Sequence, residues 1–217
     1  MTQVAPAARA ATFYEALQTQ RWDDHRFYHH SRINQSLHFV SALSFLAAYV
    51  ALIVFQDVVV AAALGWGVSM VTRQSGHFFF EPKGFDDVNQ VTHEHKEHIK
   101  VGYNLVRKYV LMSVWVLTTF VPLWTPTLFG LFDPWTTTYD YCHHVAWLWI
   151  VTGAVAILMR TVYLMATVEP RHGIVWVTKI LTDPFHDAKI YWKAPIKLLQ
   201  GERLDPMTDW PEPLRRL

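Results

Sequence analysis

The chain has 217 residues, of which 52% are hydrophobic and 15% aromatic, and its formal net charge at pH 7 is +1. So small a net charge, with no basic stripe apart from the Lys and Arg that flank apolar segments, argues against a nucleic-acid partner. The single cysteine, Cys142, excludes an internal disulfide and a cysteine-rich metal site. The length suits one domain, which we expect to cover residues 1–217.

After an amphipathic stretch at residues 13–22, four segments are apolar and long enough to cross a membrane. They cover residues 35–55, 58–80, 109–132 and 145–168. A spanning helix needs about 20 mostly apolar residues, because the hydrocarbon core is roughly 30 Å thick. In the third segment, Pro122 and Pro126 are expected to bend or break the helix. As buried core helices, the four would leave too little polar chain to enclose them. The sequence therefore predicts an all-α, polytopic membrane bundle with about four transmembrane helices.

The basic residues predict the orientation of this bundle. Outside the apolar segments, Lys and Arg occur before the first segment, between the second and third, and after the fourth. The other two connections, residues 56–57 and 133–144, contain neither. Basic residues near span ends favour the cytoplasmic side. We therefore expect both termini and the central loop to be cytoplasmic, with residues 169–217 forming a cytoplasmic tail.

This topology places all of the 12 histidines except His143 and His144 on the cytoplasmic face. His38 and His77 lie within apolar segments, where a polar side chain is costly and usually functional. His30 and His38 are eight residues apart, which is about 12 Å along a regular helix. They could not then share one ion. A non-helical break around residues 31–34 would have to fold His29 or His30 back, or the histidines would serve two ions.

Further candidate ligands follow the second span. His77 and Glu81 have an i,i+4 spacing, so the carboxylate could bind the metal or orient the imidazole. In the central loop, His95 and His98 have an i,i+3 spacing that lets two imidazoles reach one ion. The same loop, which also contains His93, could instead be a solvated charged helix. Imidazole and carboxylate ligands without thiolates suit iron, zinc, copper or manganese. A site at the membrane surface suggests a lipid-like substrate. Oxidation of unactivated carbon in such a substrate would favour iron among these metals.

Two motifs carry a family resemblance. Residues 27–38 (FYHHSRINQSLH) resemble the F-Y-H-H-x-x-x-N-x-x-x-H signature of the 2-hydroxy fatty acid dioxygenase family, membrane proteins of fatty-acid α-oxidation. Gly65-Trp66 and residues 76–81 (GHFFFE) resemble the family's G-W and G-H-x-x-F-E elements, and residues 85–90 (FDDVNQ) weakly match the segment that follows. The resemblance covers about residues 21–90. The histidine-rich central loop and the region after residue 169 have no counterpart in this pattern.

The resemblance implies an Fe(II)-dependent enzyme that uses O2 to shorten a 2-hydroxy fatty acid by one carbon. It implies an iron site formed by His29, His30, His38, His77 and Glu81. Asn34 would then be a supporting polar residue. Arg32, Arg73 or Lys83 could pair with the substrate carboxylate, although Arg73 could equally snorkel to the interface.

Two other functions fit parts of the same pattern. A lipid hydroxylase or desaturase with two iron ions would also use clustered histidines at the cytoplasmic ends of membrane helices, and His93, His95 and His98 could complete its second site. A non-enzymatic protein that carries haem or transports a metal is the other alternative. Haem would need His38 and His77 to face each other within the spans, and transport would need polar residues spread through them.

Overall fold

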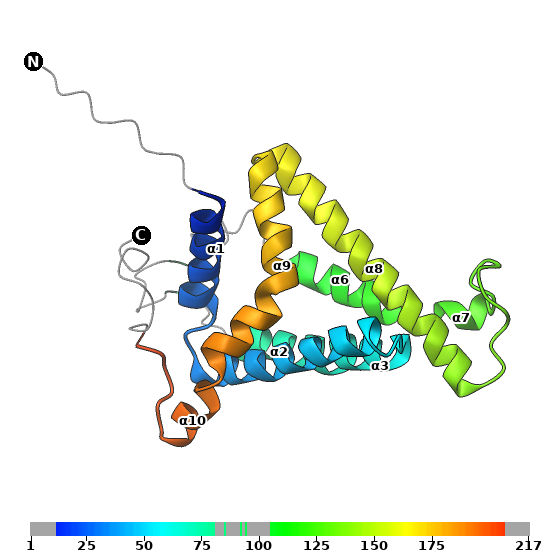
Figure 1. Ribbon diagram of the computed structural model, residues 1–217, viewed down its shortest axis with the longest axis horizontal. Helices are drawn as coiled ribbons and strands as arrows, with labels where there is room; N and C mark the ends of the chain where they lie inside the picture. The colour runs from blue at the N-terminus through cyan, green and yellow to red at the C-terminus, as the bar shows by residue number, and fades with distance from the viewer. Residues whose placement is uncertain (1–11, 81–84, 86–91, 93, 95–104, 207–217) are drawn as a thin grey trace, which may run out of the picture.

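The structure is a computed structural model that describes residues 12–80, 85, 92, 94 and 105–206. The described residues contain helices but no β-strand, as the sequence predicts (Figure 1). The helices are α1 (Phe13–Tyr28), α2 (Arg32–Ile53), α3 (Val58–Ala62), the π-helix η1 (Ala63–Met70), α4 (Val71–Phe79), α6 (Leu105–Thr118), α7 (Val121–Trp124), α8 (Thr138–Thr167), α9 (Pro170–Tyr191) and α10 (Ala194–Leu199).

A tight turn after α2 reverses the chain. Gln56 has a φ of +54°, and the Asp57 side chain caps α3 by accepting a hydrogen bond from the Val60 N–H at 2.9 Å. The segments α3, η1 and α4 then run back along α2 (Figure 1). Ser41 and Ser69 join the two arms by a buried hydrogen bond of 2.7 Å. The start of α2 and the end of α4 consequently lie together at one end of the hairpin.

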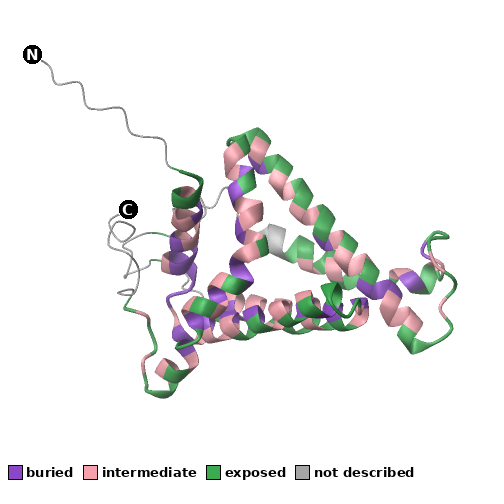
Figure 2. Ribbon diagram, viewed as in Figure 1, coloured by how far each residue is buried: buried purple, intermediate pink, exposed green. Residues whose placement is uncertain are grey.

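The helices α2, α8 and α9 form a triangular outline (Figure 1). α8 crosses the α2 hairpin at Gly153, where a Cβ atom would meet the Trp66 ring at 2.4 Å. α9 follows α8 after a break at Val168 and Glu169, then packs against α1 and the start of α2. Buried residues concentrate where α1, α9 and the start of α2 meet (Figure 2).

Two helices, α2 and α8, are long and apolar enough to cross a membrane. They correspond to the first and fourth predicted spans. The second predicted span is helical from Val58 to Phe79, but the π-helix η1 divides it into three segments. The structure therefore supports an all-α protein with two candidate membrane-spanning helices.

The third predicted span is not one continuous helix, in line with the expectation that Pro122 and Pro126 would bend or break it. α6 ends at Thr118, and α7 extends only from Val121 to Trp124 before an irregular connection. Pro122 lies in the first turn of α7, where its missing N–H is tolerated, but it could not have continued α6.

The start of the fourth helix differs from the prediction. α8 begins at Thr138 because Thr137 and Asp140 form a capping box, each side chain bonding to the other's backbone N–H. His143 and His144 therefore lie in the first two turns of α8 rather than in the preceding connection. They are at the end of α8 that is remote from α9 (Figure 1).

Candidate metal centre

Three histidines from separate segments converge at the end of the hairpin where α2 begins and α4 ends. His29 follows α1, His38 lies in α2 and His77 lies in α4. One ring nitrogen from each lies within 4.8 Å of the other two. The ring centroids are 3.9 Å apart for His29 and His38, 4.9 Å for His38 and His77, and 5.2 Å for His29 and His77. Among the described residues, this trio is the group of His, Cys, Asp or Glu side chains that could hold a metal ion.

A non-helical break, one of the two alternatives that the sequence left open, lies at residues 29–31, slightly before the predicted position. α1 ends at Tyr28, and α2 is regular from Arg32. The segment after α10 holds this break in place, because the Arg32 N–H donates to the Arg203 carbonyl at 2.9 Å and the Asp205 N–H donates to the His30 carbonyl at 2.8 Å. The break turns His29 back onto His38.

The remaining predicted ligands fall outside the trio. His30 is buried, but its Nδ1 lies 3.2 Å from the Arg26 carbonyl oxygen. Glu81, His93, His95 and His98 lie outside the described residues, so their roles as ligands stay predictions.

A tyrosine from α9 supports the first of the three histidines. The Tyr191 hydroxyl lies 3.1 Å from Nδ1 of His29 and 3.1 Å from Nδ1 of His25. Nε2 of His25 is in turn 3.4 Å from the Asp205 carboxylate. Burial raises the pKa of Tyr191 well above its ordinary value, so the hydroxyl remains protonated. This chain of polar contacts engages Nδ1 of His29 and holds its ring in place.

The second histidine, His38, is fully buried. Its Nδ1 lies 3.6 Å from the Asp187 carboxylate, and neither ring nitrogen has a hydrogen-bond partner among the described residues. Leaving a buried polar nitrogen without a partner costs about 1–3 kcal/mol. A metal ion held by the trio would supply that partner.

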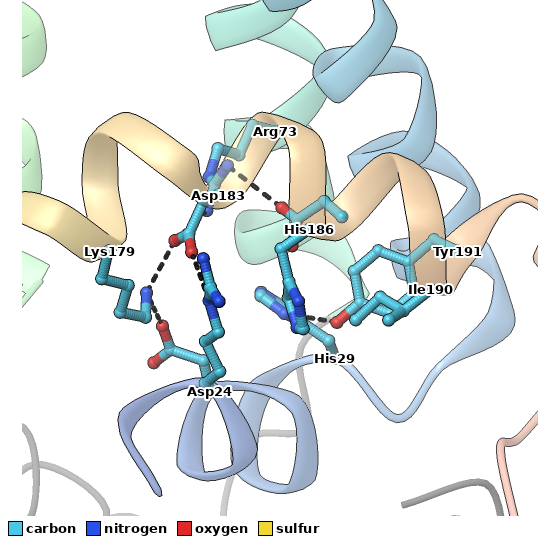
Figure 3. Close-up of a pocket in the computed structure, with 10 residues that line it drawn as sticks. Asp24, His29, Arg73, Lys179, Asp183, His186, Ile190 and Tyr191 are labelled. Carbon is cyan, nitrogen blue, oxygen red and sulfur yellow. Dashed lines mark hydrogen bonds and ion pairs between the residues drawn. The ribbon is translucent and has the colours of Figure 1, made fainter. Parts of the chain in front are cut away.

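Charged residues of α9 form a buried network beside the trio (Figure 3). The Lys179 ammonium contacts the Asp24 carboxylate and lies 2.8 Å from the Asp183 carboxylate. Arg21 reaches Asp183 at 3.5 Å. Burial alone would lower the pKa of Lys179, but Asp183 and Asp24 outweigh it and raise this pKa. Lys179 therefore stays charged inside the protein.

The network also determines the environment of Arg73. Its guanidinium lies 3.4 Å from the Asp187 carboxylate and 3.9 Å from that of Asp183. The predicted pairing of Arg73 with a substrate carboxylate would have to compete with both aspartates. Arg32 is similarly engaged, because it pairs with Glu202 and Asp205.

Asn34 links the break to the hairpin. Its Nδ2 donates to the Tyr28 carbonyl at 2.6 Å, and its side chain is fully buried. A Cβ atom on Gly76 would meet Oδ1 of Asn34 at 2.1 Å. The glycine before His77 therefore lets α4 approach α2 closely enough to bring His77 to the trio.

The sequence interpretation missed the residues of α9. Lys179, Asp183, Asp187 and Tyr191 are spaced four apart, so they lie on one face of the helix. This four-residue spacing was the sequence signal that could have identified them as one polar helix face.

Comparison of the chain with protein-family models, with curated proteins and with solved structures gives no match. The fold and site thus define an all-α protein with a buried three-histidine cluster at the end of a helical hairpin. The resemblance to 2-hydroxy fatty acid dioxygenases rests on its motif residues.

Proposed function

We propose that this chain is a multi-pass membrane enzyme with cytoplasmic termini. It holds a non-haem iron through His29, His38 and His77 and oxidises a 2-hydroxy fatty acid or a similar lipid with O2. The observation that carries this proposal is the convergence of three imidazoles, two of them buried, at one end of an apolar helical hairpin.

The donor set fits a transition metal. Neutral imidazoles bind iron, zinc and copper, and three protein ligands leave positions open for a substrate or O2. Glu81, four residues after His77 in the sequence and outside the described residues, remains the candidate for a fourth ligand. Bound iron would supply the activation of O2 and a Lewis acid for the substrate.

The surrounding residues orient the ligands. Because the Tyr191 hydroxyl bonds to Nδ1 of His29, Nε2 of His29 is the nitrogen left for the metal. The negative charge of Asp187, 3.6 Å from Nδ1 of His38, favours the tautomer with the proton on Nδ1, which would likewise direct Nε2 to the metal. Polar partners of this kind fix the tautomer of a histidine and strengthen its binding.

The charge network sets how a substrate carboxylate would be recognised. Arg21, Arg73 and Lys179 are matched by Asp24, Asp183 and Asp187 in the contacts described above. A carboxylate that entered this network would add a charge without a cation of its own. We infer that the 2-hydroxy acid is oriented chiefly by its hydroxyl and carboxylate oxygens at the metal, with its alkyl tail in the bilayer.

The proposed reaction balances with O2 as its sole oxidant. R–CH(OH)–COOH and O2 give R–COOH, CO2 and H2O, with cleavage of the Cα–C1 bond. Carbon is oxidised by four electrons, all of which reduce O2, so no separate reductant is required.

The geometry does not favour haem. Two histidines that ligate a haem lie on opposite sides of the porphyrin, but the rings of His38 and His77 are 4.9 Å apart with His29 against both. No macrocycle fits between them.

The proposal is tested with the purified protein in detergent micelles loaded with Fe(II). We expect O2 uptake with 2-hydroxypalmitate labelled at C1, with labelled CO2 and the acid one carbon shorter as products, and none with palmitate. His77→Ala should abolish turnover, whereas the matched control His143→Ala should retain it. Equal turnover in the two variants would refute the assignment, and O2 uptake without loss of C1 would indicate a hydroxylase instead.

A further inference from the structure

The helix α9 has an inverted distribution of polar and apolar side chains. Its buried face carries Lys179, Asp183 and Asp187, which are 4–6% exposed. The opposite face carries four large apolar side chains that are 48–60% exposed, and we call them the outer stripe: Ile174, Leu181, Phe185 and Trp192. Their spacings of seven, four and seven residues keep them on one side of an α-helix.

Such a helix does not suit contact with water. A surface helix of a water-soluble protein buries its apolar face and exposes its charges. In α9 the charged side chains pair with buried residues such as Asp24 of α1, whereas the side chains of the outer stripe are 48–60% exposed. Contiguous exposed apolar surface of this kind marks contact with a partner or a membrane.

The outer stripe continues onto the apolar surface of α2. The rings of Phe185 and Tyr49 are 6.3 Å apart, and the Tyr49 hydroxyl donates to the Leu181 carbonyl at 3.3 Å. Tyr49 lies about 25 Å along α2 from Arg32, since each residue of a helix rises about 1.5 Å. The outer stripe therefore reaches the apolar part of a candidate membrane span.

The helix that carries the outer stripe also adjoins the other candidate span, α8. α9 begins three residues after α8 ends, and the two helices pack together near this junction (Figure 1). A single lipid phase could then cover the exposed apolar residues of α2, α8 and α9. A second copy of the chain could cover the same residues only if its surface were complementary to all three helices.

Basic and aromatic residues border the outer stripe. Arg171 and Lys189 lie on one side of it at its two ends. Lys193 follows the helix, with its Nζ 5.3 Å from the centroid of the Trp192 ring. Cations and tryptophan are favoured at the headgroup level, where lipid phosphates are anionic.

We propose that α9 is a membrane-contacting helix whose outer stripe lies in the hydrocarbon of the bilayer and whose border cations extend to anionic headgroups. The region predicted as a cytoplasmic tail is then a part of the membrane-bound body, and it presents its polar face to the histidine trio. Lipid thus stabilises the position of Tyr191 and Asp187 relative to the ligands.

The test uses a Cys142→Ser protein reconstituted in vesicles of phosphatidylcholine and phosphatidylglycerol, with one added cysteine that carries a bimane fluorophore. The added cysteines are Phe185→Cys, with Leu181→Cys as a second stripe position, Lys189→Cys as the matched control one turn away, and Val155→Cys on α8 as the membrane control. Quenching is measured with lipids that carry a doxyl group in the acyl chain and with aqueous iodide.

We expect doxyl lipids to quench both stripe labels within about twofold of the Val155 label, and iodide to quench them at least about threefold less than the Lys189 label. Equal iodide quenching at residues 185 and 189 would overturn the proposal. So would protection of the stripe labels from both quenchers, which would show that a second copy of the chain covers the stripe. Iodide access at residue 155 as well would refute the membrane assignment itself. None of these readouts requires iron, so a failure of the metal site is distinguishable.

Discussion

Gly76 allows a close approach between the two arms of the hairpin, and replacing it tests directly how His77 reaches the trio. In Gly76→Ala, the new Cβ would lie 2.1 Å from Oδ1 and 3.2 Å from Cγ of Asn34, whereas its contact with the His38 ring, at 3.6 Å, is ordinary. One side chain therefore accounts for the clash.

The magnitude follows from these distances. Oδ1 of Asn34 is held by the amide's bond to the Tyr28 carbonyl, so relief of the clash requires α4 or Asn34 to move by roughly 1 Å. Overpacking of this kind costs about 1–3 kcal/mol, and the better helix propensity of alanine offsets up to about 1 kcal/mol of that. Displacement of His77, the next residue, should weaken metal binding by about 10-fold or more.

The assay combines thermal unfolding in micelles with metal affinity from competition against a chelator. Gly67→Ala, in the same arm, is the matched control, because a Cβ there meets nothing within 4 Å. Asn34→Ala combined with Gly76→Ala should recover much of the lost stability relative to the sum of the single changes. If Gly76→Ala binds metal as tightly as Gly67→Ala, the close approach of α4 to α2 is not what positions His77.

Three further predictions concern residues of α9. Tyr191→Phe removes the hydroxyl beside Nδ1 of His29, so metal affinity measured by chelator competition should fall about 10- to 100-fold; unchanged affinity would remove Tyr191 from the site. Lys179→Met leaves Asp24 and Asp183 short of a cation and should destabilise the fold by about 3–5 kcal/mol in chemical denaturation, with partial recovery on adding Asp24→Asn; no loss would contradict the buried network. Burial, and then the charge of Arg21, lowers the pKa of His186 from 6.5 to about 4, so the unfolded chain binds a proton at higher pH than the folded protein. The free energy of unfolding should therefore be highest above pH 6.5 and fall as the pH is lowered towards 4. In His186→Gln it should fall less steeply over this range, and identical pH profiles of the two proteins would contradict the lowered pKa.

Local sequence signals predicted part of the site. His38 and His77 could be selected because each interrupts an apolar segment, and the structure places both in the trio. The eight-residue separation of His30 and His38 also indicated that either the helix breaks between them or the histidines serve two ions. Which histidine the break would fold back was left open, because the choice depends on contacts of residues 30–32 with Arg203 and Asp205, far along the chain.

The part that sequence reasoning missed depends on long-range packing. Tyr191 is separated from His29 by 162 residues, and Lys179 meets Asp24 only because α9 crosses α1. Treating the region after residue 168 as a tail removed these partners from consideration. The break in the third predicted span could be predicted locally, since Pro122 cannot continue the helix that ends at Thr118.

The central claim is that His29, His38 and His77 hold one metal ion, and metal content per chain tests it most directly. The wild-type protein, reconstituted with Fe(II) and freed of loose ions, should retain about one iron per chain. His38→Ala should lose this iron, and so should His29→Ala and His77→Ala, whereas His143→Ala should keep it. Full iron retention in the three trio variants, or iron loss confined to His143→Ala, would contradict the account.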